Sequence, residues 1–199
     1  MSKRAQELED YPETGKRAAA KEIDHLDQYS SHFIKLSPLC FLASVGQDGI
    51  PDVSPRGGAN GFVRVVDPNT LYLPDRPGNN RLDSLSNILS NAGVSLIFVI
   101  PGFNECLRVK GKAEICFDDA ICETFIENHI KPRSFLQVTV SSAYFHCAKA
   151  FMRSNIWSIS SQVERSAMPT IGQILKDQTK TSDPLETEEE MLARYKAQL

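Results

Sequence analysis

The clearest chemical signal in the sequence is a polar segment at residues 73–84, which precedes an expected helix. Around the start of that helix lie Arg76, Asn79, Asn80, Arg81 and Ser84. A helix N-terminus presents unpaired backbone N–H groups and a partial positive charge, and both favour a phosphate group. Arginine adds the bidentate donors that match a phosphate monoester. The segment therefore predicts a phosphate site, and a solvated, capped turn is the alternative interpretation.

The chain has 199 residues, of which 41% are hydrophobic and 24% charged, as is typical of a soluble globular domain. Its formal net charge of -3 argues against general nucleic-acid binding, which favours a basic face. The apolar run at residues 94–101 is too short to span a membrane, and the polar N-terminus indicates no secretory signal. We therefore expect a cytoplasmic protein without nucleic-acid or membrane partners.

The 5 cysteines and 4 histidines show no ligand pattern. The cysteines are widely spaced and include no C-x-x-C pair, so neither a zinc site nor a disulfide framework is predicted. Because the histidines are dispersed as well, we expect no metal. Free cysteines in apolar runs behave as small buried hydrophobes, and a reducing cytoplasm is their simplest setting.

Apolar runs separated by turn signals predict a mainly β protein with flanking helices. Strand-like runs occupy residues 39–45, 70–73, 93–99, 106–116 and 135–145, and a sixth run starts at residue 50 and resumes over residues 62–66. That run is interrupted by prolines and glycines, including Gly57 and Gly58, which suggests a bulge or a close backbone approach to a ligand. Helical patterns mark residues 16–36, 80–90 and 118–130, and a capping box at Thr187 opens a terminal helix.

Hairpin turns and one inserted helix predict a six-stranded antiparallel β-barrel. We divide the chain into an N-terminal tail and helix (1–34), a barrel domain (35–160) and a C-terminal extension with a terminal helix (161–199). A dinucleotide fold is disfavoured because the sequence has no glycine-rich motif after a strand.

Four motifs that follow one another in a fixed order point to a particular family of proteins. They are residues 52–57, 73–81 and 107–111, followed by 146–150 together with Arg153, Ser154 and Trp157. The series resembles the FMN-dependent flavoproteins of the pyridoxamine 5'-phosphate oxidase-like superfamily, and most closely a poorly characterised bacterial oxidase-type branch. The resemblance covers about residues 35–160. It implies the split-barrel fold and a homodimer that holds FMN in grooves between the two subunits.

The same resemblance implies which residues bind FMN. The phosphate would be held by Arg76, Asn80 and Arg81, assisted by Ser84. The isoalloxazine ring would lie along Ser54, Pro55, Arg56 and Gly57. The ring or the ribityl chain would lie near Leu73, Pro74 and Asp75. A flat ring needs a close backbone approach, which glycine permits, and a cation near the flavin N1, for which Arg56 is the candidate, would stabilise the reduced anion.

Three residues further along the chain complete the expected flavin site. Arg108 is expected either at the flavin or in a pair with a neighbouring carboxylate, and the two interpretations stay open. Arg153 and Trp157 match the family segment that reaches the partner subunit, so a contact of Trp157 with the ring edge is expected, with core packing as its alternative. Cys147 lacks an evident activating partner, and no catalytic residue is assigned.

The chain ends in an acidic, helix-like segment that does not resemble the basic, tryptophan-containing end of the vitamin B6 oxidases. Pyridoxamine phosphate is therefore not the expected substrate. We expect an FMN-dependent oxidoreductase that acts on an unidentified small molecule. The alternatives are a non-catalytic flavin carrier or redox sensor, and a relative that binds a deazaflavin or haem instead.

Overall fold

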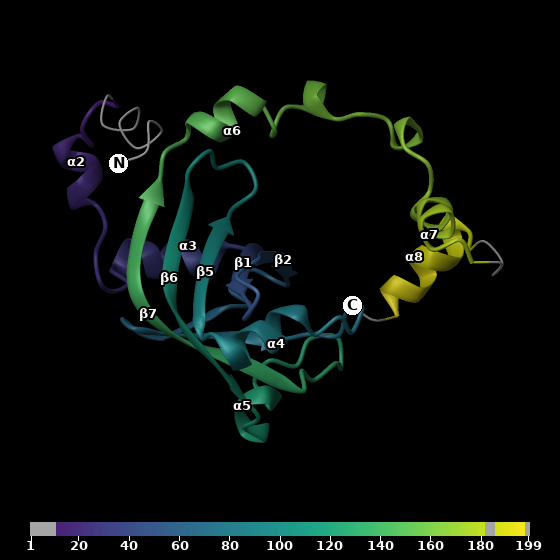
Figure 1. Ribbon diagram of the computed structural model, residues 1–199, viewed down its shortest axis with the longest axis horizontal. Helices are drawn as coiled ribbons and strands as arrows, with labels where there is room; N and C mark the ends of the chain where they lie inside the picture. The colour runs from purple at the N-terminus through teal and green to yellow at the C-terminus, as the bar shows by residue number, and fades with distance from the viewer. Residues whose placement is uncertain (1–10, 182–185, 198–199) are drawn as a thin grey trace.

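The computed structural model describes residues 11–181 and 186–197 of the chain. Within these residues seven strands form one antiparallel sheet with the order β2-β1-β5-β6-β7-β4-β3 (Figure 1). The strands are β1 (Leu39–Val45), β2 (Pro51–Gly57), β3 (Arg64–Asp67), β4 (Thr70–Asp75), β5 (Gly93–Val99), β6 (Cys106–Cys116) and β7 (Ser134–His146). The expected mainly β, antiparallel fold with flanking helices is confirmed.

The strand count is seven instead of the expected six. Residues 58–63 do not continue the interrupted strand but separate β2 from β3, which lie at opposite edges of the sheet. Gly58 and Gly61 fit this connection: a Cβ on Gly58 would lie 2.7 Å from Cβ of Phe62, and Gly61 has a φ of +78°. Packing against Phe62 in the same loop therefore accounts for the glycine at position 58. The sequence had suggested a bulge or a ligand contact for the glycines of this segment.

The described helices are α2 (Lys16–Ala20), α3 (Gln28–Leu36), α4 (Asp83–Ser90), α5 (Asp119–Glu123), α6 (Lys149–Ser154), α7 (Ile171–Thr179) and α8 (Glu188–Lys196). The expected helix over residues 16–36 is divided in two. Between the halves, Ile23 pairs with Ala143 of β7 through backbone hydrogen bonds of 3.0 and 2.8 Å. α3 then begins afresh because the Asp27 carboxylate accepts a hydrogen bond from the Ser30 N–H at 2.8 Å.

The long β6–β7 hairpin bends at Gly111, where the pairing register shifts. A Cβ at this glycine would lie 2.2 Å from the Thr139 carbonyl oxygen, so only glycine lets the two backbones approach this closely. One half of the hairpin pairs with β5 and the other half with β4. The bend therefore turns the two halves of the sheet toward each other, as a split barrel requires.

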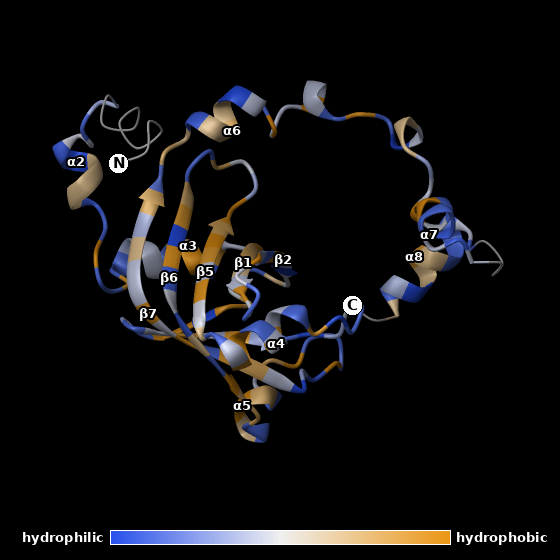
Figure 2. Ribbon diagram, viewed as in Figure 1, coloured by the Kyte–Doolittle hydropathy of each residue, from blue (hydrophilic) through white to orange (hydrophobic). Residues whose placement is uncertain are grey.

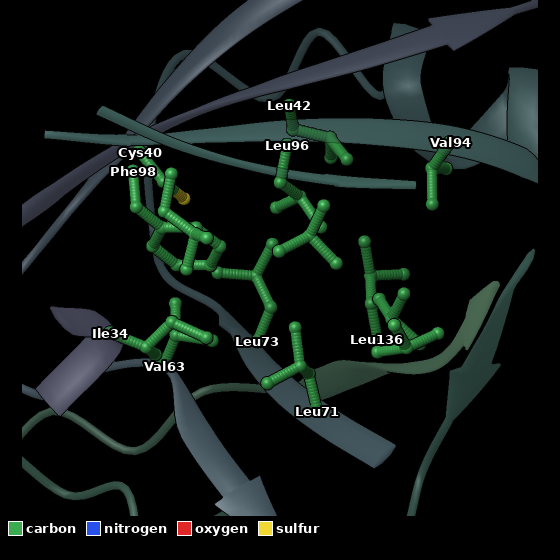
Figure 3. Packing of buried hydrophobic residues seen from close by; sticks show 14 of the residues in the cluster. Ile34, Cys40, Leu42, Val63, Leu71, Leu73, Val94, Leu96, Phe98 and Leu136 are labelled. Carbon is green, nitrogen blue, oxygen red and sulfur yellow. The ribbon is translucent and has the colours of Figure 1, made fainter. Parts of the chain in front are cut away.

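The core lies between these two halves. Leu42 of β1 and Leu96 of β5 face Leu71 and Leu73 of β4 across the interior, while Ile34 of α3 packs at one end (Figure 3). Along β1 and β6 buried residues alternate with more exposed ones, so one set of side chains points inward, and in β6 the outward set is charged (Figure 2). α4 packs on the same core through Ile88, so the start of this helix is held at a fixed place beside the sheet.

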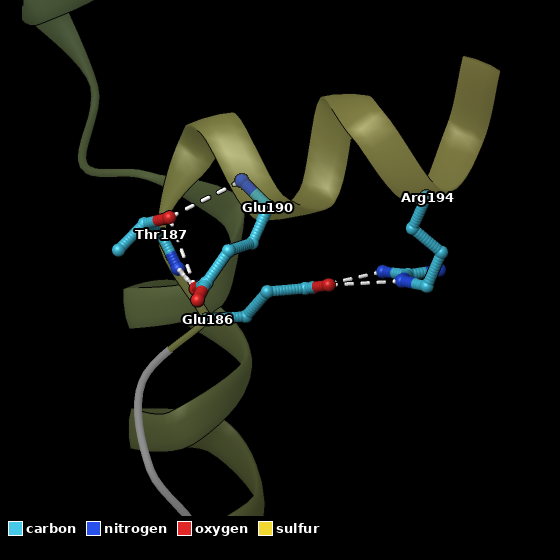
Figure 4. Close-up of polar contacts among 4 residues, drawn as sticks. All are labelled: Glu186, Thr187, Glu190 and Arg194. Carbon is cyan, nitrogen blue, oxygen red and sulfur yellow. Dashed lines mark hydrogen bonds and ion pairs between the residues drawn. The ribbon is translucent and has the colours of Figure 1, made fainter. Parts of the chain in front are cut away.

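The C-terminal part of the chain runs away from the sheet after α6, and α8 lies beside α7 with its last turn pointing back toward the rest of the chain (Figure 1). Two short 3₁₀ turns, Ile159–Ser161 and Arg165–Ala167, interrupt this path before α7. The expected capping box of the terminal helix is present: the Thr187 hydroxyl accepts from the Glu190 N–H, and the Glu190 carboxylate accepts from the Thr187 N–H (Figure 4). No helix in the described residues is long and apolar enough to cross a membrane.

Candidate functional site

A cavity of about 780 Å³ opens between strand β2 and the segment that connects β4 to α4. Residues 52–57 form one wall and residues 74–85 the other. Phe62, Arg133 and two residues of α8, Arg194 and Tyr195, complete the lining. The wall at 74–85 is the segment in which the sequence predicts a phosphate site.

Strand β2 offers one polar face to this cavity. Its residues alternate between exposed and half-buried, so Asp52, Ser54 and Arg56 share the half-buried face. The Arg56 Nη1 lies 3.3 Å from Oδ1 of Asp75, and the two side chains are each 22% exposed. This ion pair ties β2 to the end of β4 and holds the guanidinium within the cavity lining.

The connection from β4 to α4 is shaped by two asparagines. Asn80 takes the left-handed conformation with a φ of 56°, and the Asn79 side chain accepts from the Arg81 N–H at 3.1 Å. Gly78, in the same connection, does not have a positive φ. At the start of the same connection Arg76 forms an ion pair, in which its Nη2 lies 2.6 Å from Oε2 of Glu127.

The start of α4 is open to a ligand. The helix begins at Asp83, and within the described chain its N-cap residue, Leu82, makes no side-chain cap hydrogen bond. The Asp83 N–H donates to the Arg81 carbonyl, and no cap side chain meets the other N–H groups of the first turn, which favours anion binding at this helix start. Nearby, the Ser84 hydroxyl donates to the Asp52 carboxylate at 3.3 Å.

The cavity is more positive than the chain as a whole. Its lining contains five arginines and three aspartates, namely Arg56, Arg76, Arg81, Arg133 and Arg194 against Asp52, Asp75 and Asp83. Arg81 lies 2.8 Å from the Asp83 carboxylate, and this hydrogen bond raises the pKa of the Arg81 guanidinium. Two of the five arginines also have glutamate partners outside the lining, since Glu127 lies 2.6 Å from Arg76 and Glu186 lies 2.8 Å from Arg194. The lining residues themselves carry a net positive charge, which favours an anionic ligand.

Two donors in the lining lack a partner. The Nε atoms of Arg56 and Arg76 are buried and have no hydrogen-bond partner within the described residues. Buried polar groups are usually hydrogen-bonded, so an unpaired donor in a cavity wall marks a place for a polar ligand. The donor set, the open helix start and the positive lining together fit a molecule that carries a phosphate.

Most of the sequence-predicted FMN residues line this one cavity. Those that do are Ser54, Pro55, Arg56, Gly57, Pro74, Asp75, Arg76, Asn80, Arg81 and Ser84. Leu73 lies elsewhere: its side chain is 2% exposed and belongs to the core (Figure 3). The alternating pattern of β4 explains this, because Leu71 and Leu73 point the same way into the barrel.

The other three expected residues do not line the cavity of their own chain. Arg108 places its guanidinium 5.3 Å from the ring centre of Tyr144, and it forms no ion pair within the described residues. Trp157 donates from Nε1 to the Phe103 carbonyl at 2.9 Å and stacks on Phe151 at 5.8 Å between ring centres. Arg153 lies in the last turn of α6 and is exposed.

Sequence reasoning missed several residues of the lining. Arg133 precedes β7 and has no motif around it, and Arg194 and Tyr195 come from the C-terminal helix. The capping box at Thr187 signalled the helix, but nothing in the sequence indicated that its last turn meets the cavity. Asp52, which accepts the hydrogen bond from Ser84, belongs to the motif at residues 52–57, but the sequence assigned it no role.

The cysteines in the described residues differ in exposure, because Cys147 is exposed whereas Cys40, Cys106 and Cys122 are buried and Cys116 is partly buried. Burial raises the pKa of the Cys40 thiol to about 12, so this residue carries no thiolate at neutral pH. Burial also raises the pKa of Cys106, Cys116 and Cys122. Among the residues that the structure describes, no group of three histidine, cysteine or acidic side chains is arranged to hold a metal ion.

The architecture and the cavity define a split-barrel protein of the pyridoxamine 5'-phosphate oxidase-like type. Residues 26–147, more than half of the 199-residue chain, match the sequence model of the family described as pyridoxamine 5'-phosphate oxidase. The chain belongs to this family. No curated protein gives a significant match.

Solved structures of similar fold are distant in sequence. HupZ of Group A Streptococcus is 22% identical, with a TM-score of 0.48 over 60% of this chain and 92% of that one. General stress protein 26 of Bacillus anthracis is 16% identical, with a TM-score of 0.45 over 57% and 88% of the two chains. An FMN-binding protein of Syntrophomonas wolfei is 6% identical, with a TM-score of 0.46 over 57% and 79%.

Proposed function

We propose that the protein binds FMN in the cavity between β2 and the β4–α4 connection and acts as an FMN-dependent oxidoreductase. One observation carries the proposal: Arg56 and Arg76 each leave a buried Nε atom without a partner in the described part of a positive cavity wall. Membership of the family supports flavin as the ligand that meets these donors. The substrate is a small organic molecule other than pyridoxamine phosphate.

The phosphate would lie at the start of α4, where Arg76, Arg81 and the uncapped N–H groups of the first turn converge on the cavity. Asn80 fixes the backbone there through its left-handed conformation. Asp83 opposes this binding with its negative charge, which the ion pair with Arg81 partly offsets. An arginine that faces both a carboxylate and a phosphate can bridge them because it has five N–H donors.

The ring would lie along β2, where Ser54, Pro55, Arg56 and Gly57 form the wall. Packing within the protein does not require glycine at position 57, because a Cβ there would meet only the Pro38 carbonyl oxygen at 3.5 Å. In this proposal the missing side chain leaves room for the ring. Bound FMN would supply the redox chemistry, passing a hydride or electrons between the substrate and an acceptor such as oxygen. The chain's own residues hold and orient the cofactor, and Arg56 places a positive charge beside the ring.

We further propose that the protein is a cytoplasmic homodimer. Its five cysteines are all free, which fits a reducing compartment. Arg108, Arg153 and Trp157 lie outside the cavity of their own chain, so in this proposal they approach the flavin of the partner subunit. Trp157 is 37% exposed, and this leaves part of its ring available for such a contact.

The first test is the visible spectrum of the purified protein, with the released cofactor identified by mass. We expect oxidised-flavin bands and about one FMN per chain. Apoprotein titrated in parallel with FMN, riboflavin, a deazaflavin and haem should bind FMN most tightly, because riboflavin lacks the phosphate. If the protein binds none of these four compounds, the proposal is refuted. If it binds the deazaflavin or haem more tightly than FMN, that compound replaces FMN as the proposed ligand.

Turnover separates an enzyme from a carrier or sensor, since both need the same cavity. Reduction of the bound FMN by nicotinamide donors, followed by reoxidation with small acceptors, should proceed over repeated cycles. A protein that binds FMN but shows no turnover with any donor would keep the flavin assignment and lose the enzyme assignment.

A further inference from the structure

Positive side chains gather on the face of the β6–β7 hairpin that points away from the core. Leu107 and Val109 of β6 are fully buried, so Arg108 and Lys110, which alternate with them, point to the opposite face. Tyr144 of β7 is the register partner of Arg108 and lies beside it. None of the three outward residues lines the cavity described above. The hairpin therefore places two cations and an aromatic ring together at a second location.

The segment that follows α2 brings a third cation to the same ring. This segment runs beside β7 (Figure 1), where Ile23 forms a backbone bridge to the edge of the strand. The Lys21 Nζ lies 5.2 Å from the centre of the Tyr144 ring. The guanidinium of Arg108 and the Nζ of Lys110 lie 5.3 and 5.8 Å from the same centre. We call Lys21, Arg108, Lys110 and Tyr144 the Tyr144 cluster.

Among the described residues, Glu22 is the carboxylate that pairs with this cluster. Its Oε1 lies 3.1 Å from the Lys110 Nζ and accepts a hydrogen bond from the Ser142 hydroxyl at 2.6 Å. The hydrogen bond from Ser142, followed by that from Lys110, lowers the pKa of the Glu22 carboxyl, which therefore stays ionised at neutral pH. Strand β5 adds no charge here, because its residues opposite the two β6 cations are Ile97 and Ser95. Three cations beside this carboxylate leave an excess of two positive charges.

Two buried nitrogen atoms at the cluster have no hydrogen-bond partner within the described residues. One is Nε of Arg108, and the other is Nδ1 of His146, whose ring lies 6.5 Å from that of Tyr144. Buried polar atoms are normally hydrogen-bonded, and like charges gathered around one ring repel one another. An excess of positive charge with an unpaired guanidinium nitrogen therefore favours a bound anion.

We propose that the Tyr144 cluster binds the phosphate group of a small molecule, at a site separate from the flavin cavity. A phosphate monoester carries about two negative charges near neutral pH, which matches the excess of the cluster. Arg108 supplies a planar fork of donors, and Lys21 and Lys110 supply compact charges on flexible stems. An arginine has five N–H donors, so this role is compatible with the flavin contact of Arg108 proposed above. The site requires neither FMN nor the homodimer.

Fluorine NMR of protein labelled with 3-fluorotyrosine tests the cluster and the cavity in one spectrum. The chain has 5 tyrosines, of which Tyr144 belongs to the cluster and Tyr195 lines the cavity, and Tyr144→Phe and Tyr195→Phe assign their resonances. Inorganic phosphate, titrated at an ionic strength held constant with chloride, should shift the Tyr144 resonance saturably. A parallel titration with glycerol 3-phosphate identifies the source of the group: tighter binding of the ester indicates an organic phosphate, and tighter binding of inorganic phosphate indicates the free ion.

The two resonances separate this proposal from the flavin proposal. If neither compound shifts the Tyr144 resonance, or if only the Tyr195 resonance responds, the proposal is overturned, and in the second case phosphate binds in the cavity alone. A saturable Tyr144 response in a protein that takes up no FMN would support the cluster and refute the flavin assignment.

Matched variants test which charges hold the phosphate. Arg108→Gln removes a cation of the cluster, whereas Lys112→Gln removes the same charge from an exposed position further along β6. The dissociation constant of phosphate, read from the Tyr144 resonance, should rise at least about ten-fold in the first variant and stay nearly unchanged in the second. Equal effects of the two variants would overturn the proposal. Glu22→Gln removes the opposing carboxylate and should tighten phosphate binding, which a loss of structure cannot produce; unchanged or weaker binding would contradict the site.

Discussion

Arg76 offers the sharpest test of the proposed phosphate site. Its guanidinium is 22% exposed, pairs with Glu127 at 2.6 Å, and keeps a buried Nε without a partner in the described residues. Replacing Arg76 alone would leave the Glu127 carboxylate, which is 31% exposed, without its counter-ion. The informative comparison is therefore between Glu127→Gln and the double variant Arg76→Ala with Glu127→Gln, because the two differ only in the Arg76 guanidinium and neither leaves the Glu127 carboxylate unpaired.

The expected magnitude follows from the chemistry of the lost contact. A hydrogen bond to a charged group contributes about 1.5–3 kcal/mol. For the double variant, compared with Glu127→Gln, we expect a loss of about 2 kcal/mol, which raises the dissociation constant of FMN roughly 30-fold. Glu127→Gln alone should bind FMN as tightly as the wild type or more so, because it removes a negative charge near the phosphate while its amide oxygen can still accept from the Ala59 N–H. Riboflavin has no phosphate, so its binding should be unchanged in both variants.

Fluorescence quenching of each flavin by the apoprotein measures these constants directly. The phosphate assignment depends on the contrast between the two ligands. If the double variant weakens FMN and riboflavin by the same factor, Arg76 acts through the fold or the ring and the reasoning is refuted. Thermal unfolding of both variants without flavin provides the control for a general loss of structure.

Four further outcomes follow from the structure. Arg81→Ala should weaken FMN less than the Arg76 change, since Arg81 is 75% exposed, whereas Asp83→Asn should strengthen FMN; flavin titration checks both. Gly58→Ala should cost about 1–3 kcal/mol in chemical unfolding because its Cβ meets Phe62 at 2.7 Å. Leu73→Ala should lower the free energy of unfolding by about 2–5 kcal/mol and leave the flavin preference intact. Between pH 9 and 11 the unfolding free energy should fall, because the Cys40 thiol ionises near 9 when unfolded and only at about 12 when folded; Cys40→Ala should reduce that slope by about 1.4 kcal/mol per pH unit.

The sequence predicted the strands, and it singled out the β4–α4 connection that forms one wall of the cavity, because both depend on local patterns. β1, β5 and β6 are apolar runs bounded by turns, and the residues of the β4–α4 connection have the types that a phosphate needs. Two further local patterns in the sequence indicate features that the structure has. Asp27 is a typical N-cap that divides the expected N-terminal helix, and the period of two along β4 directs Leu73 inward.

The remaining features arise from contacts between distant parts of the chain. Arg133, Arg194 and Tyr195 reach the cavity only because the barrel closes and the C-terminal segment returns to it. No spacing rule connects residue 195 with residue 76, so their proximity could not be predicted without a three-dimensional arrangement. The same holds for β2 and β3, which are neighbours in sequence but occupy opposite edges of the sheet.

Strand β2 has a consequence for how this protein avoids uncontrolled association. It is an edge strand, and the Gly58 N–H donates to the Pro38 carbonyl, so the even-numbered amides of β2 face β1 and the odd-numbered ones face outward. Two of those outward positions are Pro51 and Pro55, which have no N–H to donate. An incoming strand would find an N–H donor at only every second outward residue of this edge, although the outward carbonyls can still accept, so the sheet is a poor template for fibre growth.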